Sequence, residues 1–233
     1  MEFTTLGRTG LTVSVAALGC GGASRLGLAR GGSEANAVTV VQRALDLGVN
    51  LIDTAYAYGT EHVVGRALRD RRDAAVVSTK LHVFTGEEGK PSGTGRIAEP
   101  REIRARLEES LSRLGMESVD ILFIHGLRVG DYDRAVEAAV PVLGELRDEG
   151  KFRFLAVSEH FGSETAHDML LRAVQDDIWD VFMVGHNLIN HSARSELLPL
   201  CRKKNIGTMD MFAVRRALSD PAHGRAIVGE LRL

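Results

Sequence analysis

Polar and ionisable side chains come directly after apolar runs at several places in the sequence. Asp53 ends the run "NLID", and Tyr56 and Tyr58 stand just beyond it. Lys80 follows "VVST", and His125 follows "ILFI". Brought together, these residues would place a carboxylate, a phenol, an ammonium group and an imidazole at one site, where pKa values are commonly perturbed. Such a set can perform acid-base catalysis, although each residue alone is explained as well by packing or solvation.

The apolar runs themselves predict strands that are buried on both faces. Each run is a continuous apolar stretch that ends in polar or small residues, and the runs are "VAALGCGG", "NLIDTA", "AAVVST", "SVDILFIH", "FRFLAVS", "WDVFMVG" and "NIGTMDMF". Continuous runs, rather than strict alternation, are typical of parallel strands that are covered on both sides. Seven such strands are therefore expected.

Helical patterns separate most of these runs. In "PREIRARLEESLSRLG", apolar residues recur at helical spacing between a starting proline, Pro100, and a closing glycine, Gly115. We expect Ser163 to cap the helix in "SETAHDMLLRAV" and Pro141 to kink or break the helix in "DRAVEAAVPVLGELRDEG". The long glycine-rich connection from His82 to Arg96 is expected to be a mobile lid that shapes substrate access.

Repeated strand-helix units predict a parallel α/β sheet with right-handed crossovers. A (β/α)₈ TIM barrel is favoured over an open sheet, because "GCGGAS" lacks the GxGxxG spacing of a dinucleotide fingerprint. The polar residues also cluster where strands end, which is where such barrels build their active sites. The stretch "FTTLGRTGLTVS" predicts an N-terminal β-hairpin. No eighth strand is evident after "TMDMF", so the barrel is expected to be incomplete at its C-terminal end.

Composition narrows the class of protein. A length of 233 residues fits one α/β domain, so residues 1–233 are predicted to form a single domain. Hydrophobic content of 44% and a net charge of -2 indicate a soluble protein without nucleic acid or a membrane as its main partner. Two cysteines and a polar N-terminus suggest the cytoplasm. The histidines lack paired metal-ligand spacing, so no metal site is predicted.

Several motifs together resemble a known family. In chain order, "FTTLGRTGLTVS", "DTAYAYGTE", "STK", "DILFIH" and "GKFRFLAVS" are similar to successive signatures of the aldo-keto reductases of bacterial type. The resemblance implies a catalytic tetrad made up of Asp53, Tyr58, Lys80 and His125. It also implies reduction of an aldehyde or ketone, or oxidation of the alcohol, by hydride transfer from NADPH or NADH.

The chemistry of these residue types agrees with the implied tetrad. Tyr58 would donate a proton to the developing alkoxide, but a free tyrosine, with a pKa of about 10, is a weak acid-base catalyst at neutral pH. A lysine ammonium beside the phenol lowers that pKa, and a paired aspartate keeps the lysine charged. A histidine can orient and polarise the substrate carbonyl. Tyr56 has no motif role and is expected to pack.

The family resemblance also assigns candidate cofactor-binding residues, with departures from the usual pattern. These candidates are Ser158, Glu159, Met183, Phe212 and Arg215. The family usually has asparagine and glutamine where this chain has Glu159 and Met183. Glu159 could accept a hydrogen bond from the nicotinamide carboxamide, whereas Met183 offers only weak sulfur contacts. Phe212 falls where the family stacks an aromatic ring, and Arg215 could either reach the pyrophosphate or be an ordinary surface arginine.

Alternatives remain open at this stage. The short C-terminal end fits a truncated barrel, a barrel whose open edge is closed by a second copy in a homo-oligomer, or a divergent member with altered cofactor use. Lys80 could instead form a Schiff base with a carbonyl substrate, although a neighbouring Asp53 would hold it protonated. A regulatory or binding protein on the same fold is the other alternative. The main expectation is a reductase for a small-molecule carbonyl substrate.

Overall fold

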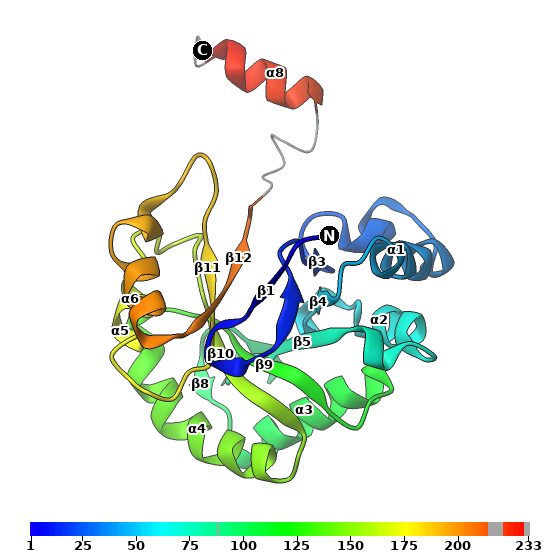
Figure 1. The fold of residues 1–233 in the computed structure, drawn as a ribbon. Coiled ribbons are helices and arrows are strands. Elements are labelled where there is room, and N and C mark those ends of the chain that lie inside the picture. Colours follow the sequence, from blue (N-terminus) through cyan, green and yellow to red (C-terminus); the bar gives the residue numbers. More distant parts are fainter. Residues whose placement is uncertain (88, 214–220, 231–233) are drawn as a thin grey trace.

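The computed structural model describes residues 1–87, 89–213 and 221–230. Its centre is a seven-stranded sheet that curls around a buried interior (Figure 1). The strands, in chain order, are β3 (Leu18–Gly19), β4 (Leu51–Asp53), β5 (Val76–Leu81), β9 (Val119–Leu127), β10 (Phe152–Glu159), β11 (Val181–Gly185) and β12 (Gly207–Met211). They pair in parallel in the order β12-β11-β10-β9-β5-β4-β3. The predicted run of seven parallel strands is confirmed.

Helices cover the outer face of the sheet. They are α1 (Glu34–Asp46), α2 (Glu61–Leu68), α3 (Pro100–Leu114), α4 (Tyr132–Asp148), α5 (Asp168–Ala173) and α6 (Leu197–Lys204), and α8 (Pro221–Glu230) follows the last strand. Helix α3 shows how the sequence sets their ends. A capping box joins Glu99 and Glu102 at its start, and Gly115, at φ +62°, ends it in the left-handed conformation. In the described part of the chain, no helix is long and apolar enough to span a membrane.

Two hydrophobic cores explain why the strands read as continuous apolar runs. Along β9, Ile121 and Phe123 point into the curled sheet, whereas Leu122 and Ile124 pack against the outer helices. Because successive side chains alternate between the faces of a strand, both sets are buried. The interior core also contains Met183.

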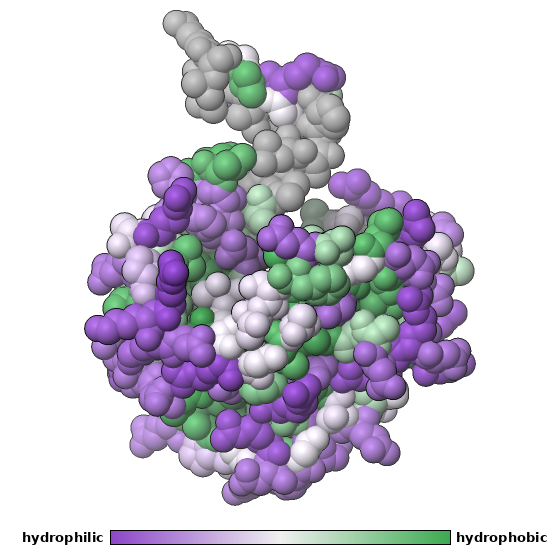
Figure 2. Space-filling view, in the orientation of Figure 1, coloured by the Kyte–Doolittle hydropathy of each residue, from purple (hydrophilic) through white to green (hydrophobic). Residues whose placement is uncertain are grey.

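The N-terminal hairpin joins β1 (Phe3–Thr5) and β2 (Thr12–Ser14) in antiparallel register, as predicted. It lies across the end of the interior where the strands begin. The backbone N–H of Arg8 donates to the carbonyl of Asn205, 2.6 Å away and just before β12. The backbone N–H of Ser14 donates to the Asn50 side chain, 2.6 Å away and just before β4. The hairpin therefore bridges opposite sides of the open sheet. In Figure 2 the face seen is ringed by hydrophilic residues and is less polar at its centre.

Two local predictions differ from the structure, and one connection contains an unpredicted sheet. Helix α5 begins at Asp168, not near Ser163, because the Ser163 hydroxyl is used in a turn with His160. Pro141 lies inside a continuous helix α4 on its exposed side, where water can solvate the carbonyl that loses its partner. The connection expected to be a mobile lid carries a small antiparallel sheet that the sequence did not predict, with β6 (Phe84–Thr85) between β7 (Pro91–Ser92) and β8 (Arg96–Ile97), and its role as a lid stays a prediction.

Candidate active site

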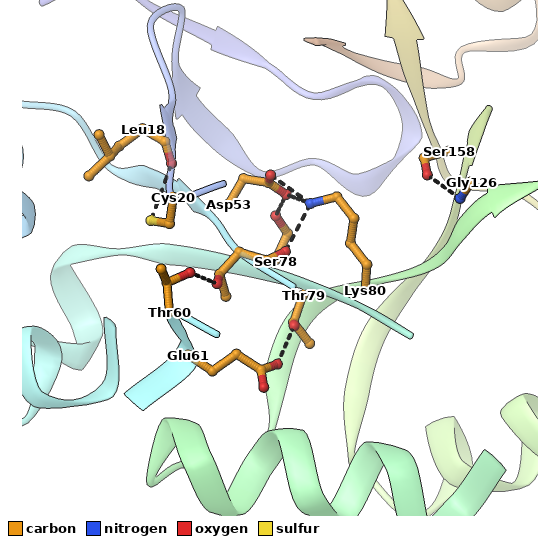
Figure 3. A network of polar contacts seen from close by, with 11 residues as sticks. Leu18, Cys20, Asp53, Thr60, Glu61, Ser78, Thr79, Lys80, Gly126 and Ser158 are labelled. Carbon is orange, nitrogen blue, oxygen red and sulfur yellow. Dashed lines mark hydrogen bonds and ion pairs between the residues drawn. The ribbon is translucent and has the colours of Figure 1, made fainter. Parts of the chain in front are cut away.

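A buried ion pair lies at the carboxyl ends of two neighbouring strands. Asp53 ends β4, and Lys80 lies near the end of β5 with no exposed surface. The Lys80 Nζ donates to both carboxylate oxygens of Asp53, at 2.5 and 2.6 Å, and to the carbonyl of Thr54 at 2.8 Å. The Ser78 hydroxyl donates to the same carboxylate at 2.7 Å (Figure 3). These partners satisfy charges that would otherwise be very costly to bury.

Tyr58 lies over this ion pair. It ends a short 3₁₀ turn, Tyr56–Tyr58, and Gly59 follows in the left-handed conformation at φ +67°. The Lys80 Nζ is 5.0 Å from the centre of the Tyr58 ring. Burial raises the pKa of the Tyr58 phenol above its usual value, and the charge of Lys80 only partly opposes this. The pKa of Tyr58 is thus raised, whereas a lysine neighbour alone predicts that it is lowered. Tyr58 therefore keeps its proton at neutral pH.

His125 completes the group from β9. Its ring meets the Tyr58 ring edge-on, with 5.6 Å between centroids and 85° between planes. Burial, together with the nearby charge of Lys80, holds the pKa of His125 well below its usual value, so the imidazole is neutral. All four residues of the implied tetrad therefore lie together. Tyr56 does not join them, because its ring packs 4.2 Å from the guanidinium of Arg113.

Ser158 supports the neighbourhood of His125. Its hydroxyl oxygen, at the end of β10, accepts a hydrogen bond of 2.8 Å from the backbone N–H of Gly126 (Figure 3). Gly126 has φ +64° and directly follows His125 within β9, where the register with β10 shifts. Because this bond uses an oxygen lone pair, the hydroxyl proton of Ser158 is left for another partner.

Glu159 is buried in a hydrogen-bond network that the sequence did not reveal. One carboxyl oxygen accepts from the backbone N–H of Gly185 at 2.7 Å, and both lie 3.0 Å from His167 Nδ1. The other ring nitrogen of His167 lies 2.8 Å from the Ser192 hydroxyl. Burial raises the pKa of Glu159 to about 8 and lowers that of His167. At neutral pH this favours a protonated Glu159 that donates to a neutral imidazole.

The remaining cofactor candidates are spread over several environments. Phe212, half-exposed after β12, stacks on Phe161 with 5.9 Å between ring centroids. Phe161 also stacks on His167 at 5.7 Å, so the aromatic group adjoins the Glu159 network. Met183 is 5% exposed and belongs to the interior core. Arg215 lies outside the described residues.

Comparison with known proteins identifies the family. Residues 17–223 match the Aldo/keto reductase family. The chain belongs to this family. Over 216 residues it is 32% identical to an L-galactose dehydrogenase from Arabidopsis thaliana, covering 90% of this chain and 64% of that protein. It is also 32% identical, over 245 residues, to a D-threo-aldose 1-dehydrogenase from Pseudomonas sp, covering 94% of this chain and 73% of that protein.

A solved aldo-keto reductase gives the same picture of the fold. The holo form of an aldo-keto reductase from Bacillus halodurans aligns with a TM-score of 0.72 and 25% sequence identity, covering 90% of this chain and 65% of that one. The chain thus spans slightly less than two thirds of the plant dehydrogenase and of this structure. The α/β-barrel architecture is confirmed, with seven parallel strands in the part of the aldo/keto reductase described here.

Two residues at the site were missed from the sequence. His82 stacks on His125, with 4.6 Å between ring centroids and 13° between planes. Gly21 lies against Tyr58, since a Cβ added there would be 2.6 Å from the ring. His82 stands two positions after Lys80, and this spacing places both on one face of an extended chain. The spacing between Lys80 and His82 could therefore have identified His82 from the sequence. No pattern in the sequence around Gly21 indicates its contact with Tyr58.

Proposed function

We propose that this aldo/keto reductase interconverts an aldehyde or ketone and its alcohol, with Tyr58 as the proton donor. The observation that carries the proposal is the contiguous group that the buried Asp53–Lys80 ion pair forms with the partly buried Tyr58 and His125. When bound, NADPH or NADH would supply the hydride. The residues around the site fit a nicotinamide ring, because the Ser158 hydroxyl keeps a free proton and Phe212 offers a half-exposed aromatic face.

Each side chain has a defined part in this reaction. His125, as a neutral imidazole, holds the substrate carbonyl by a hydrogen bond. Tyr58 gives its proton to the oxygen as the hydride reaches the carbon. Lys80 stabilises the phenolate that remains, and Asp53 keeps the ammonium in place. Ser158, Glu159, Met183, Phe212 and Arg215 remain the proposed cofactor neighbours, with Glu159 acting together with His167.

The substrate is proposed to be a small carbonyl compound. The names of the relatives point to sugars and short aldehydes, since they include an aldose dehydrogenase and an NADH-specific methylglyoxal reductase from Escherichia coli. A cytoplasmic location stays a prediction, as does a second copy that pairs with the open sheet edge. Analytical ultracentrifugation would test the latter.

Replacing Tyr58 with phenylalanine tests the proposal. We expect Tyr58→Phe to bind NADPH or NADH as the wild type does and to lose turnover by about 10²- to 10⁴-fold, because only the proton donor is removed. Tyr56→Phe is the matched control, since this ring packs on Arg113, and it should keep nearly full activity. Quenching of Trp179 fluorescence reports cofactor binding, and loss of NAD(P)H absorbance reports turnover. Full activity in Tyr58→Phe would refute the assignment.

The Schiff-base alternative has a different outcome in a simple trapping experiment. Borohydride would fix a carbonyl substrate covalently on Lys80 if the lysine were a nucleophile. The bonds from Nζ to both oxygens of Asp53 oppose this, because they stabilise the charged ammonium. We expect no adduct at Lys80 by mass spectrometry. A binding or regulatory protein would show neither an adduct nor turnover.

A further inference from the structure

His82 is the one described side chain that stacks face to face on His125. It follows the end of β5, and its carbonyl oxygen accepts a 2.7 Å hydrogen bond from the buried guanidinium of Arg106. Across the small sheet, a Cβ at Gly93 would be 3.9 Å from the imidazole. The His82 ring is therefore held between the proposed catalytic histidine and the β7–β8 connection.

The ring nitrogens show which edge of each imidazole is available. The Nδ1 atoms of His82 and His125 are buried and have no hydrogen-bond partner among the described residues. In the described residues, neither Nε2 atom is among the buried atoms without a partner, and the backbone of His125 lies within hydrogen-bonding reach of the His82 ring. Since both side chains are partly exposed, each Nε2 is open to solvent. The Nε2 edges of the two stacked rings are thus the edges that a ligand can reach.

Both rings are in the state that suits hydrogen bonding to a neutral ligand. Burial lowers the pKa of His82, as it does that of His125, so each ring carries one N–H and one lone pair at neutral pH. A hydroxyl group both donates and accepts, and it can satisfy either tautomer of His82. A carbonyl at the same point only accepts, so it satisfies only the tautomer that carries the N–H there, and an apolar group satisfies neither tautomer.

We infer that His82 is a specificity-determining residue that binds a hydroxyl group on the carbon next to the reacting carbonyl. The 4.6 Å spacing between the two ring centroids fits oxygens on adjacent carbon atoms of one substrate, and it is too short for two separate molecules. His125 would hold the carbonyl oxygen, and His82 the neighbouring hydroxyl. The inference rests on the proposed function and makes 2-hydroxy aldehydes and ketones the favoured substrates.

A matched pair of substrates tests this inference. Reduction of 2-hydroxypropanal and of propanal is measured with NADPH and with NADH, in the wild type, His82→Phe and His82→Gln. Phenylalanine keeps a ring to stack on His125 but has no nitrogen, and glutamine restores a donor and an acceptor. His62→Phe, at a partly exposed surface position, is the control for the same exchange.

The ratio of kcat/KM for 2-hydroxypropanal over propanal is the quantity that decides. We expect a ratio of about ten in the wild type and in His62→Phe, from one added hydrogen bond. It should fall close to one in His82→Phe, which still reduces propanal, and recover partly in His82→Gln. An unchanged ratio in His82→Phe overturns the inference, as does a His82→Phe variant that loses both activities together. If the wild type reduces neither aldehyde, the proposed function fails, and the role of His82 fails with it.

Discussion

The position of the Tyr58 ring depends on a residue that has no side chain. Gly21 allows the loop after β3 to lie directly against this ring, because a Cβ at that position would be 2.6 Å from a ring carbon. The backbone of Gly21 does not need a positive φ angle, so alanine can adopt the same conformation there. A substitution at Gly21 therefore acts on the tyrosine rather than on the fold.

We expect Gly21→Ala to lower kcat by about 10²-fold or more, because a shift of about 1 Å in a reacting group has effects of that size. The free energy of unfolding should change much less. Gly19→Ala is the matched control, since nothing lies within 4 Å of a Cβ at that position. Steady-state kinetics and urea denaturation measure both quantities. Equal activity in the two variants would show that Tyr58 does not need this position.

Glu159 predicts a distinctive dependence of stability on pH. Its pKa rises from 4.5 to about 8 on folding, so the folded state holds a proton that the unfolded state releases between these values. Stability should therefore fall as pH rises through this range, by up to about 1.4 kcal/mol per pH unit from this group. The fall ends above the folded pKa.

Glu159→Gln isolates this effect. A glutamine accepts from the Gly185 N–H and donates to His167, as the protonated acid does, and it does not titrate. We expect the variant to gain stability relative to the wild type as pH rises from 5 to 8, measured by urea unfolding at each pH. Other groups titrate equally in both proteins and cancel in the difference. A difference that does not change with pH would mean that Glu159 is ionised when folded.

The residues of the proposed site could be predicted from the sequence by type, but their electrostatics could not. Asp53, Lys80 and His125 could be picked out because each follows an apolar run at a strand end. The raised pKa of Tyr58 could not, since it depends on how deeply the phenol is buried. The partner of Glu159 was equally hidden, because His167 comes from an irregular loop with a left-handed backbone at φ +67°.

At the scale of elements, a single arginine organises the connection between β5 and α3. The side chain of Arg106, from α3, donates to the carbonyls of His82 and Phe84 at 2.7 and 3.0 Å, and to the Thr85 hydroxyl at 2.7 Å. Only 7% of this arginine is exposed. The small sheet at the site is therefore anchored to α3 through Arg106.

We expect Arg106→Met to destabilise the protein by about 2–4 kcal/mol, because it leaves buried carbonyls without donors. Hydrogen exchange should rise first in residues 84–97, before global unfolding. Arg101→Met on the same helix is the control, since that side chain is largely exposed and forms its ion pair, among the described residues, with Glu99. It should change stability by less than about 0.5 kcal/mol. Uniform exchange across the chain in Arg106→Met would contradict a local anchoring role.

Helices and strands were predictable where an apolar pattern repeats along the sequence. They were less predictable where a single residue determines the point at which an element begins. The strands and long helices follow from apolar runs and helical spacing. The start of α5 was placed too early, because Ser163 has the composition of a cap but turns back to His160. The sheet at β6 to β8 could not be foreseen, since strands of two residues carry no periodic pattern.

For the whole molecule, the hairpin sets a strict steric requirement at Gly7. This residue has φ +48°, and a Cβ there would be 2.2 Å from the backbone nitrogen of Gly207 at the start of β12. We expect Gly7→Ala to lower the free energy of unfolding by several kcal/mol, about 3 or more, from backbone strain and the clash together. Thermal and urea denaturation measure this loss.

Gly10 provides the control for that prediction. It also has a positive φ, +68°, but a Cβ at this position would have no neighbour within 4 Å. Gly10→Ala should therefore cost only about 1 kcal/mol, from the backbone conformation alone. Equal losses in the two variants would show that the contact between the hairpin and β12 is not required.

The same hairpin has a consequence for how the protein is made. Arg8 bonds to Asp177 and to the carbonyl of Lys204, partners 169 and 196 positions away in the chain. Contacts of such long range form late, because a large loop must first be closed. During synthesis the apolar side chains of Leu6, Leu11 and Val13 emerge before β11 and β12, the strands that carry Val181, Met183 and Met209 of the same core. We expect the nascent chain to expose this segment until β12 has left the ribosome, which makes the hairpin a binding site for chaperones.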